Sequence, residues 1–424
     1  MGLPGLLKRR LLRGGLTRQL VPTAALVALL GGCGTIRRDL PVMLYVAISV
    51  QDETDLSTEN AALLRQRFNQ LVQDFRRVHP NVLVQVALYR EGNLRKQLQV
   101  RNQAGLGPDL ILTGADSALT LLRAGLVDAI PDSPELRGDS DPELLKRVRS
   151  RDGRLAGQPM VLLPQLACYD LRQLRQPPTS LTGLLQTSAA GLPVGLPMAV
   201  RQLLWTAGGF GAVPGLAAAE QGHQPSPLER SRIRNWLTWL QQASNQQRVL
   251  FMPNQTDLRH GLSQGTLAWV SCNSGELALL RHRMGPHLGV TPLPNGSHHP
   301  ASPVNRLRVL ALGRNSSAIQ RQMSLKLIRF GVGPLVQRSL TLDSLTFLPA
   351  NPHVSVPVQS SSVLAAMVTS RQQAQKVDHL LADIDQEDSR LPKLQSDVIV
   401  PVLFGLVEPE RATDRLIGIL RKQP

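Results

Sequence analysis

The chain has 424 residues, a formal net charge of +16 and only 3% aromatic residues. A chain of this length builds two or three domains with sizeable cores, which excludes a single small module. Its basic residues are scattered rather than gathered in one block and stacking aromatics are scarce, so the composition argues against a nucleic-acid-binding protein.

Residues 1–32 have the pattern of an export signal. Basic residues without an acidic neighbour precede an apolar run from Val21 to Leu30, and this run is shorter than the roughly 20 residues that a membrane-spanning helix needs. The run leads into Leu30-Gly31-Gly32-Cys33, which resembles a bacterial lipobox. The resemblance implies that Cys33 is acylated and becomes the mature N-terminus. The alternative is an incidental or buried cysteine near an uncleaved anchor.

Strands and helices alternate along the next part of the chain. The continuous apolar run MLYVAISV at 43–50 predicts a strand buried on both faces. Apolar residues spaced three and four apart predict a helix over 61–77, and VLVQVALY predicts a second strand. A helix around 94–100, the strand DLILT and a helix over 116–123 follow. The order β-α-β-α-β-α predicts a parallel sheet covered by helices.

The order of these segments also resembles a known family. The stretch from FRRVHPNVLVQV to GLGPDLILTGADSALTLLRAGLVDAIP is similar to the first lobe of the family 1 extracellular solute-binding proteins of ABC importers, which are maltose-binding-protein-like. Later segments are similar to parts of that family in the same order: DGRLAGQPMVLLPQLACYD, GTLAWVSCNSG, LGVTPLPNG, and SSAIQRQMSLKLIRFGVGPLVQRSL followed by FLPAN.

The resemblance implies an α/β, two-lobed periplasmic-binding-protein-like fold (type II), in which each lobe is a sheet flanked by helices. We expect a signal peptide at 1–32 and a tether at 33–42. Lobe 1 should then comprise 43–164 plus 292–345, and lobe 2 should comprise 165–291 plus 346–424 with C-terminal helices. The lobes should join at hinge crossings near Leu163-Pro164-Gln165 and Val290-Thr291-Pro292.

Candidate ligand-binding residues lie where predicted strands end, because the carboxyl ends of parallel strands meet at one cleft. We expect six residues to face that cleft: Asp52, Thr113, Asp116, Tyr169, Arg201 and Trp269. The resemblance places Asp116 where maltose-binding proteins have an aspartate that accepts hydrogen bonds from sugar hydroxyls; the alternative is a cap of the following helix. Arg201 could bind a carboxylate or phosphate with two parallel hydrogen bonds, or be a solvated surface group.

The sequence indicates no catalytic or metal chemistry. It has no G-x-S-x-G elbow, no H-E-x-x-H motif and no cysteines at metal-ligand spacing. We therefore predict no enzyme, no cofactor and no metal, and we interpret His282, His287, His298 and His299 as solvated loop residues. Cys168 and Cys272 are expected to be two small buried side chains, with a disulfide as the alternative in an oxidising compartment.

We conclude from the sequence that the chain is an exported, monomeric lipoprotein that binds a small polar solute, such as a sugar or polyol. Its partners would be that solute and the permease of an ABC importer, with no nucleic acid. The lipid would hold it on the outer side of the cytoplasmic membrane or in the periplasm. An alternative is a sensor or envelope structural protein with the same fold and no transport role; an envelope hydrolase is a weaker one.

Overall fold

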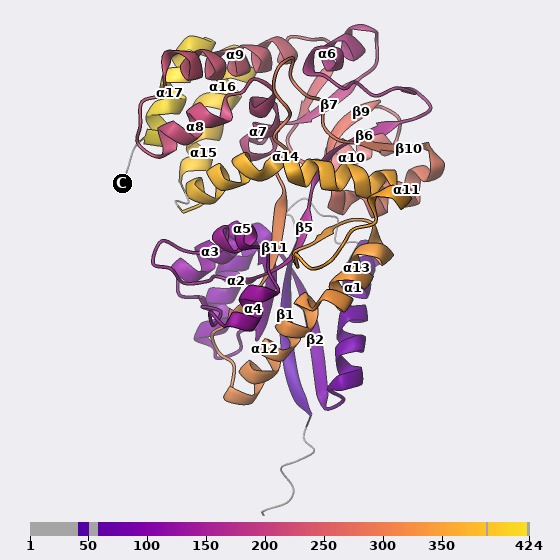
Figure 1. Ribbon diagram of the computed structural model, residues 1–424, viewed down its shortest axis with the longest axis vertical. Coiled ribbons are helices and arrows are strands. Elements are labelled where there is room, and N and C mark those ends of the chain that lie inside the picture. Colours follow the sequence, from indigo (N-terminus) through magenta and orange to yellow (C-terminus); the bar gives the residue numbers. More distant parts are fainter. Residues whose placement is uncertain (1–40, 51–57, 387–388, 422–424) are drawn as a thin grey trace, which may run out of the picture. The chain divides into compact units, whose positions relative to one another are not determined.

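The structure is a computed structural model that describes residues 41–50, 58–386 and 389–421, with side chains described from Phe68 onward in the second range (Figure 1). The protein contains two mixed β-sheets, and we call each sheet together with its helices a lobe. The first sheet has the strand order β12-β5-β11-β3-β1-β2, with β4 paired to β11. Its strands are β1 (Val42–Val50), β2 (Val82–Arg90), β3 (Leu110–Gly114), β4 (Val127–Asp128), β5 (Gln158–Leu163), β11 (Arg306–Gly313) and β12 (Leu348–Pro349).

The second sheet has the strand order β10-β6-β9-β7-β8. Its strands are β6 (Gln165–Asp170), β7 (Val194–Pro197), β8 (Val249–Met252), β9 (Trp269–Asn273) and β10 (Leu288–Thr291). In the first sheet β1 runs parallel to β2 and β3, and in the second sheet β7 runs parallel to β8 and β9. The strands next to the crossings are antiparallel, as β11 is to β3 and β6 is to β9.

Helices pack on both sheets. The helices of the first lobe are α1 (Thr58–Val78), α2 (Glu91–Gln103), α3 (Ala115–Arg123), α4 (Pro134–Gly138), α5 (Pro142–Lys146), α12 (Ala318–Val332) and α13 (Pro334–Ser344). Those of the second lobe are α6 (Leu181–Ala189), α7 (Val200–Gly209), α8 (Val213–Glu220), α9 (Pro227–Ser244), α10 (Gln255–Ser263), α11 (Leu277–Met284), α14 (Ser362–Ile384), α15 (Arg390–Leu394), α16 (Val400–Leu403) and α17 (Pro409–Arg421). The two-lobed α/β fold predicted from the sequence is confirmed. Figure 1 shows α14 lying along the junction of the lobes.

Local sequence explains where α9 begins and which face it buries. Ser226 and Glu229 form a reciprocal capping box, and Pro227 occupies the first turn, where its missing N–H costs nothing. Its apolar residues Ile233, Trp236, Leu237 and Leu240 are all buried. The Trp236 indole N–H also donates a hydrogen bond of 2.8 Å to the Thr206 hydroxyl, so its polar atom is satisfied inside the core.

The chain crosses between the sheets close to the two predicted places. At the first crossing β5 ends at Leu163 and β6 begins at Gln165, so a single residue, Pro164, connects the two strands. The return passes from β10 to β11, but residues 292–305 pack with the second lobe, where Leu293 and Ala301 belong to the core and Val304 packs against it. β12 pairs with β5 in the first sheet, which extends that lobe beyond the expected end at 345.

Cys168 on β6 and Cys272 on β9 form a disulfide with a Cα–Cα distance of 5.8 Å. The sequence predicted two small buried cysteine side chains and left a disulfide open as the alternative; the structure has the disulfide. β6 is buried on both faces, because Leu166 and Cys168 contact one core whereas Ala167 and Tyr169 contact the other. Within the described ranges, none of the helices has the length and apolar character of a membrane span.

Candidate functional site

Polar side chains from both lobes line a cavity at the crossing strands. This central cavity, of about 170 Å³, is lined by Asp116 and Arg306 of the first lobe and by Gln165, Arg201 and Asn273 of the second, among others. An outer cavity of about 340 Å³ shares Asp116 and Arg201 with it. A third cavity of about 270 Å³ shares Arg306 and Asn273; we call it the strand-end cavity, because the ends of β1, β3 and β11 line it.

An ionic chain crosses the cleft through Arg201. Asp116 lies in the first turn of α3, Arg201 in the first turn of α7, and Asp385 directly after α14. The Arg201 guanidinium lies 3.6 Å from an Asp116 oxygen and forms a second, closer ion pair with Asp385. Desolvation raises the pKa of Asp116, but attraction to Arg201 and Arg306 outweighs it and the net pKa is lowered. Asp116 is therefore a carboxylate acceptor in the cleft.

The helix-cap alternative for Asp116 does not describe the start of α3. Gly114 occupies the N-cap position, and no side chain caps that end of the helix. Asp116 lies two residues further on, where a negative charge still interacts favourably with the helix dipole. Its side chain keeps 44% of its surface exposed, so it is accessible from the cleft.

A second ion pair lies beside the first. Glu91, the first residue of α2, pairs with Arg306 at the start of β11. Glu91 also accepts a hydrogen bond of 2.9 Å from the Ser117 hydroxyl. Both Glu91 and Arg306 line the central cavity, so the first lobe presents a paired acid and base there.

Side-chain amides supply the neutral hydrogen-bonding groups of the cleft. Gln165 donates to the Gln202 carbonyl at 2.8 Å and accepts from the Val304 N–H at 3.0 Å. Gln255 donates to the Gln202 amide oxygen at 2.7 Å. Asn305 lines the central cavity, and its side-chain nitrogen is buried without a hydrogen-bond partner. A buried donor of this kind is costly unless a ligand or water accepts its proton.

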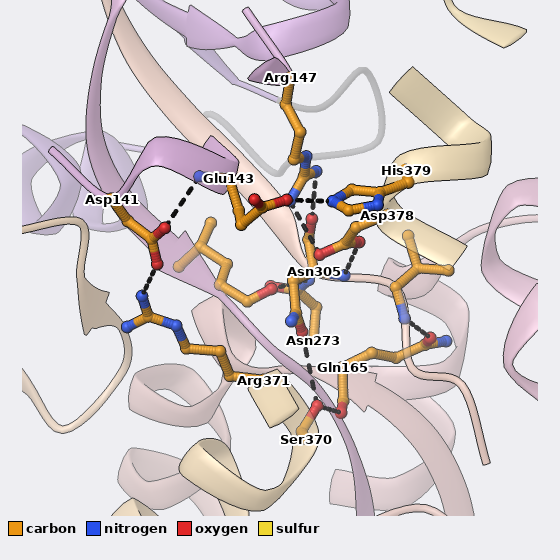
Figure 2. A network of polar contacts seen from close by, with 12 residues as sticks. Asp141, Glu143, Arg147, Gln165, Asn273, Asn305, Ser370, Arg371, Asp378 and His379 are labelled. Atoms are coloured by element: carbon orange, nitrogen blue, oxygen red, sulfur yellow. Dashed lines mark hydrogen bonds and ion pairs between the residues drawn. The ribbon is translucent and has the colours of Figure 1, made fainter. Parts of the chain in front are cut away.

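A polar network holds α14 against the crossing (Figure 2). Arg147, which follows α5, pairs with Asp378 on α14 at 3.0 Å and donates to the Asn305 carbonyl at 2.6 Å. Burial raises the pKa of Asp378 to about 6, against the opposing effect of Arg147 and the Asn305 N–H. Ser370 on α14 donates to the Gln165 carbonyl at 2.8 Å. These contacts tie one helix to both crossing segments.

The chain matches the family model of the bacterial extracellular solute-binding proteins over residues 70–366, well over half of its length. It belongs to this family. Members of the family are binding proteins outside the cytoplasm, which agrees with the predicted export and with a ligand site instead of a catalytic one. No curated protein sequence matches the chain.

Solved structures share the fold of this solute-binding protein. The GacH receptor of Streptomyces glaucescens GLA.O aligns with a TM-score of 0.71 at 16% identity, covering 89% of this chain and 97% of that one. An ABC transporter solute-binding protein of Thermotoga lettingae TMO aligns with a TM-score of 0.67 at 15% identity, covering 89% and 100%. The maltose/maltodextrin-binding domain MalE of Bdellovibrio bacteriovorus aligns with 0.64 at 14%, covering 89% and 98%.

The structure brings only part of the predicted site of this solute-binding protein together. Asp116 and Arg201 meet in the cleft. Tyr169 and Trp269 are register partners on β6 and β9, are 8% and 0% exposed, and line neither the central, the outer nor the strand-end cavity. They face the core of the second lobe, where burial raises the pKa of Tyr169. Asp52 and Cys33 lie outside the described residues.

Thr113 does not line the strand-end cavity itself, but it is hydrogen-bonded to a residue that does. It is fully buried, and its hydroxyl accepts a hydrogen bond of 2.9 Å from the Ser49 hydroxyl. Ser49 in turn accepts hydrogen bonds from Arg308, which lines the strand-end cavity. Thr113 is therefore placed to orient residues that line the strand-end cavity. A direct role of Thr113 in ligand binding stays a prediction.

Sequence reasoning did not identify Arg306 and Arg308, although a signal was present. In RLRVLALG, two arginines alternate at the start of an apolar run, which places both on the same face of a strand. Charged side chains are rarely buried, so two of them at one end of an otherwise buried strand indicate that this end of the strand faces a polar site. Within the described ranges, no group of three or more His, Cys, Asp and Glu side chains is arranged to hold a metal.

Proposed function

We propose that this protein captures a small polar solute, such as a sugar or polyol, in the central cavity and delivers it to an ABC importer. The observation that carries the proposal is that polar side chains of both lobes line one cavity. A ligand bound between hinged lobes is enclosed when they close. Once water is expelled, each hydrogen bond left unmade costs binding energy, so selectivity would come from polar matching.

The structural relatives support a carbohydrate as the solute. The GacH receptor was solved with acarbose, the Thermotoga lettingae protein with alpha-D-tagatose, and the Bdellovibrio domain with maltotriose. Among the described residues, no aromatic side chain lines the central cavity. Stacking of sugar rings on aromatic faces is then a minor contribution there, which favours a small, hydrogen-bonded solute over a long oligosaccharide.

Native mass spectrometry of protein purified from its own cells tests solute binding, because a tightly held solute survives purification. We expect a retained small mass that belongs to a sugar or polyol derivative. Uptake of that compound should fall in cells lacking the protein and recover when the wild-type gene is restored. Normal uptake without the protein would support the sensor alternative, and turnover of the compound by the pure protein would support a hydrolase.

Closure of the lobes would accompany binding, because Pro164 is the single residue between β5 and β6, and the chain returns to the first sheet where residues 292–305 lead from the second lobe into β11. Small-angle X-ray scattering should then give a smaller radius of gyration with saturating ligand than without. An unchanged radius of gyration at saturation would argue against a hinged trap.

Lipid anchoring at Cys33 would keep the protein close to its permease. Acyl chains on one residue tether a soluble domain stably when there are two or more of them. The C33S variant should move from the membrane fraction to the soluble fraction. Membrane retention of this variant would refute the assignment, and the abundance of the protein in both fractions controls for degradation.

A further inference from the structure

Arginine side chains gather on the strand-end cavity. Arg259, Arg306 and Arg308 all line it, together with apolar residues such as Leu112 and Met160. Two of these arginines have a carboxylate partner: Arg259 pairs with Glu276 at 2.6 Å, and Arg306 pairs with Glu91. The apolar surroundings lower the local dielectric constant, so any charge that is left unbalanced there acts strongly on a ligand.

Arg308 is the arginine of this cavity that has no carboxylate ion-pair partner among the described residues, although the charges of Glu91 and Asp116 attract it. Its residue is 8% exposed, and it donates hydrogen bonds to neutral oxygens: the Ser49 hydroxyl at 3.2 Å, the Ser49 carbonyl at 2.7 Å and the Leu112 carbonyl at 2.9 Å. Within the described part of the chain, no carboxylate forms an ion pair with it. Burial, with a smaller effect of Arg306, lowers its pKa to about 10, so the side chain is still a cation at neutral pH.

Arg259 shows a second unsatisfied group at the same cavity. Its residue is 3% exposed, and its Nε is buried without a hydrogen-bond partner, although a terminal nitrogen pairs with Glu276. Guanidinium donors that are buried without acceptors are costly to the folded protein. An anionic oxygen group in the cavity would act on both arginines, and above all on Arg308, which has no carboxylate partner among the described residues.

We propose that the strand-end cavity binds an anionic oxygen group of the solute, a carboxylate or a phosphate, so that the transported compound is an acidic sugar derivative. The inference rests on the proposed function, because the cavity shares Arg306 and Asn273 with the central cavity. One small solute would then place its hydroxyl groups in the central cavity and its anionic group beside Arg308. Glu91 and Glu276 pair with Arg306 and Arg259, and Asp116 lies 3.6 Å from Arg201, so none of these three carboxylates forms an ion pair with Arg308.

The wild-type protein tests this directly, by calorimetric titration at one ionic strength with D-glucose, D-glucuronate and D-glucose 6-phosphate, and by thermal shift with inorganic phosphate against sodium chloride. We expect at least tenfold tighter binding of an anionic sugar than of glucose, and a higher melting temperature in phosphate than in chloride. The glucuronate and phosphate arms distinguish a carboxylate from a phosphate ligand.

The R308Q variant should lose the preference for anions, whereas R175Q should keep it. Arg175 is exposed and lines none of the three cavities, so its loss removes the same charge far from the site. If R308Q does not fold, the milder R308K variant and the wild-type comparison carry the test. Absence of protection by phosphate, glucuronate and glucose 6-phosphate overturns the inference. Tight binding of a neutral sugar alone overturns it while leaving the proposed function standing, and binding of no sugar counts against both.

Discussion

Reduction of the Cys168–Cys272 disulfide should destabilise the protein by about 2–5 kcal/mol without abolishing ligand binding. The bridge spans a sequence separation of 104 residues, and the loop-entropy model gives about 4.7 kcal/mol for a loop of about 100 residues. The lower part of the range is reached if the reduced, unfolded chain keeps residual structure. The backbone pairing of β6 with β9 survives reduction, so the strand ends Gln165 and Asn273 should keep their places in the cleft.

Urea unfolding followed by tryptophan fluorescence measures this effect, because Trp205, Trp236, Trp239 and Trp269 are all buried. With a slope of about 3 kcal/mol/M, a loss of about 3 kcal/mol lowers the unfolding midpoint by about 1 M. The measurement uses the C33S protein, so that the only other cysteine is absent. Equal midpoints with and without reductant would refute the reasoning.

The C168A/C272A variant is the matched control for reduction. Alanine is preferred to serine because both positions are buried, and a buried hydroxyl would need its own hydrogen-bond partner. This variant should unfold close to the midpoint of the reduced protein and should not respond to reductant. Titration of two free thiols in the unfolded, untreated C33S protein would show directly that the bridge does not form.

Other predictions address the cleft, the second sheet and the core. The D116A variant should bind the retained solute about 1–3 kcal/mol more weakly in calorimetry, with little change in the melting temperature of the empty protein; the reverse result would mean that Asp116 is structural. Asp170 is buried, and the Arg172 guanidinium lowers its pKa, so its contribution to stability is present above the ordinary pKa of 3.8 and lost as pH falls through the lowered value. D170N should therefore melt below wild type at neutral pH, and the gap should close as the pH falls below 3.8 and through the lowered pKa; a gap independent of pH would contradict this. W236A should lose about 3–5 kcal/mol in urea unfolding and W236F less, because phenylalanine keeps most of the buried area and loses only the hydrogen bond to Thr206; equal losses would contradict the packing argument.

Local periodicity was sufficient to predict much of the first lobe. The apolar run at 43–50, the helical spacing at 61–77 and the alternation at 82–89 correspond to β1, α1 and β2 within a few residues at each end. In α9 the apolar residues Ile233, Trp236, Leu237 and Leu240 also recur at helical spacing, and all four are buried. These predictions succeed because a strand or helix with one consistent buried face needs no information from distant parts of the chain.

Contacts between distant segments were beyond the reach of local patterns. Arg201 pairs with Asp385, which is 184 residues away, and no spacing rule connects them. Tyr169 and Trp269 show a related limit of predicting side-chain environment from strand alternation. Alternation separates the two faces of β6, but both faces are buried, so the pattern cannot tell which of them meets a cleft and which meets a core.

The sequence by itself determined the alternation of strands and helices, and Asp116 and Arg201 as polar groups following strands; its resemblance to a known family implied the two-lobed α/β class. The tertiary structure decided that these two residues meet across the lobes, that Cys168 and Cys272 pair, and that Arg308 lies buried beside a cavity without a carboxylate partner in the described residues. The physical reason is the distance along the sequence between the residues that determine each feature. Secondary structure follows from side chains a few positions apart, whereas the charge balance of a cleft depends on which distant strand ends the fold brings to one edge.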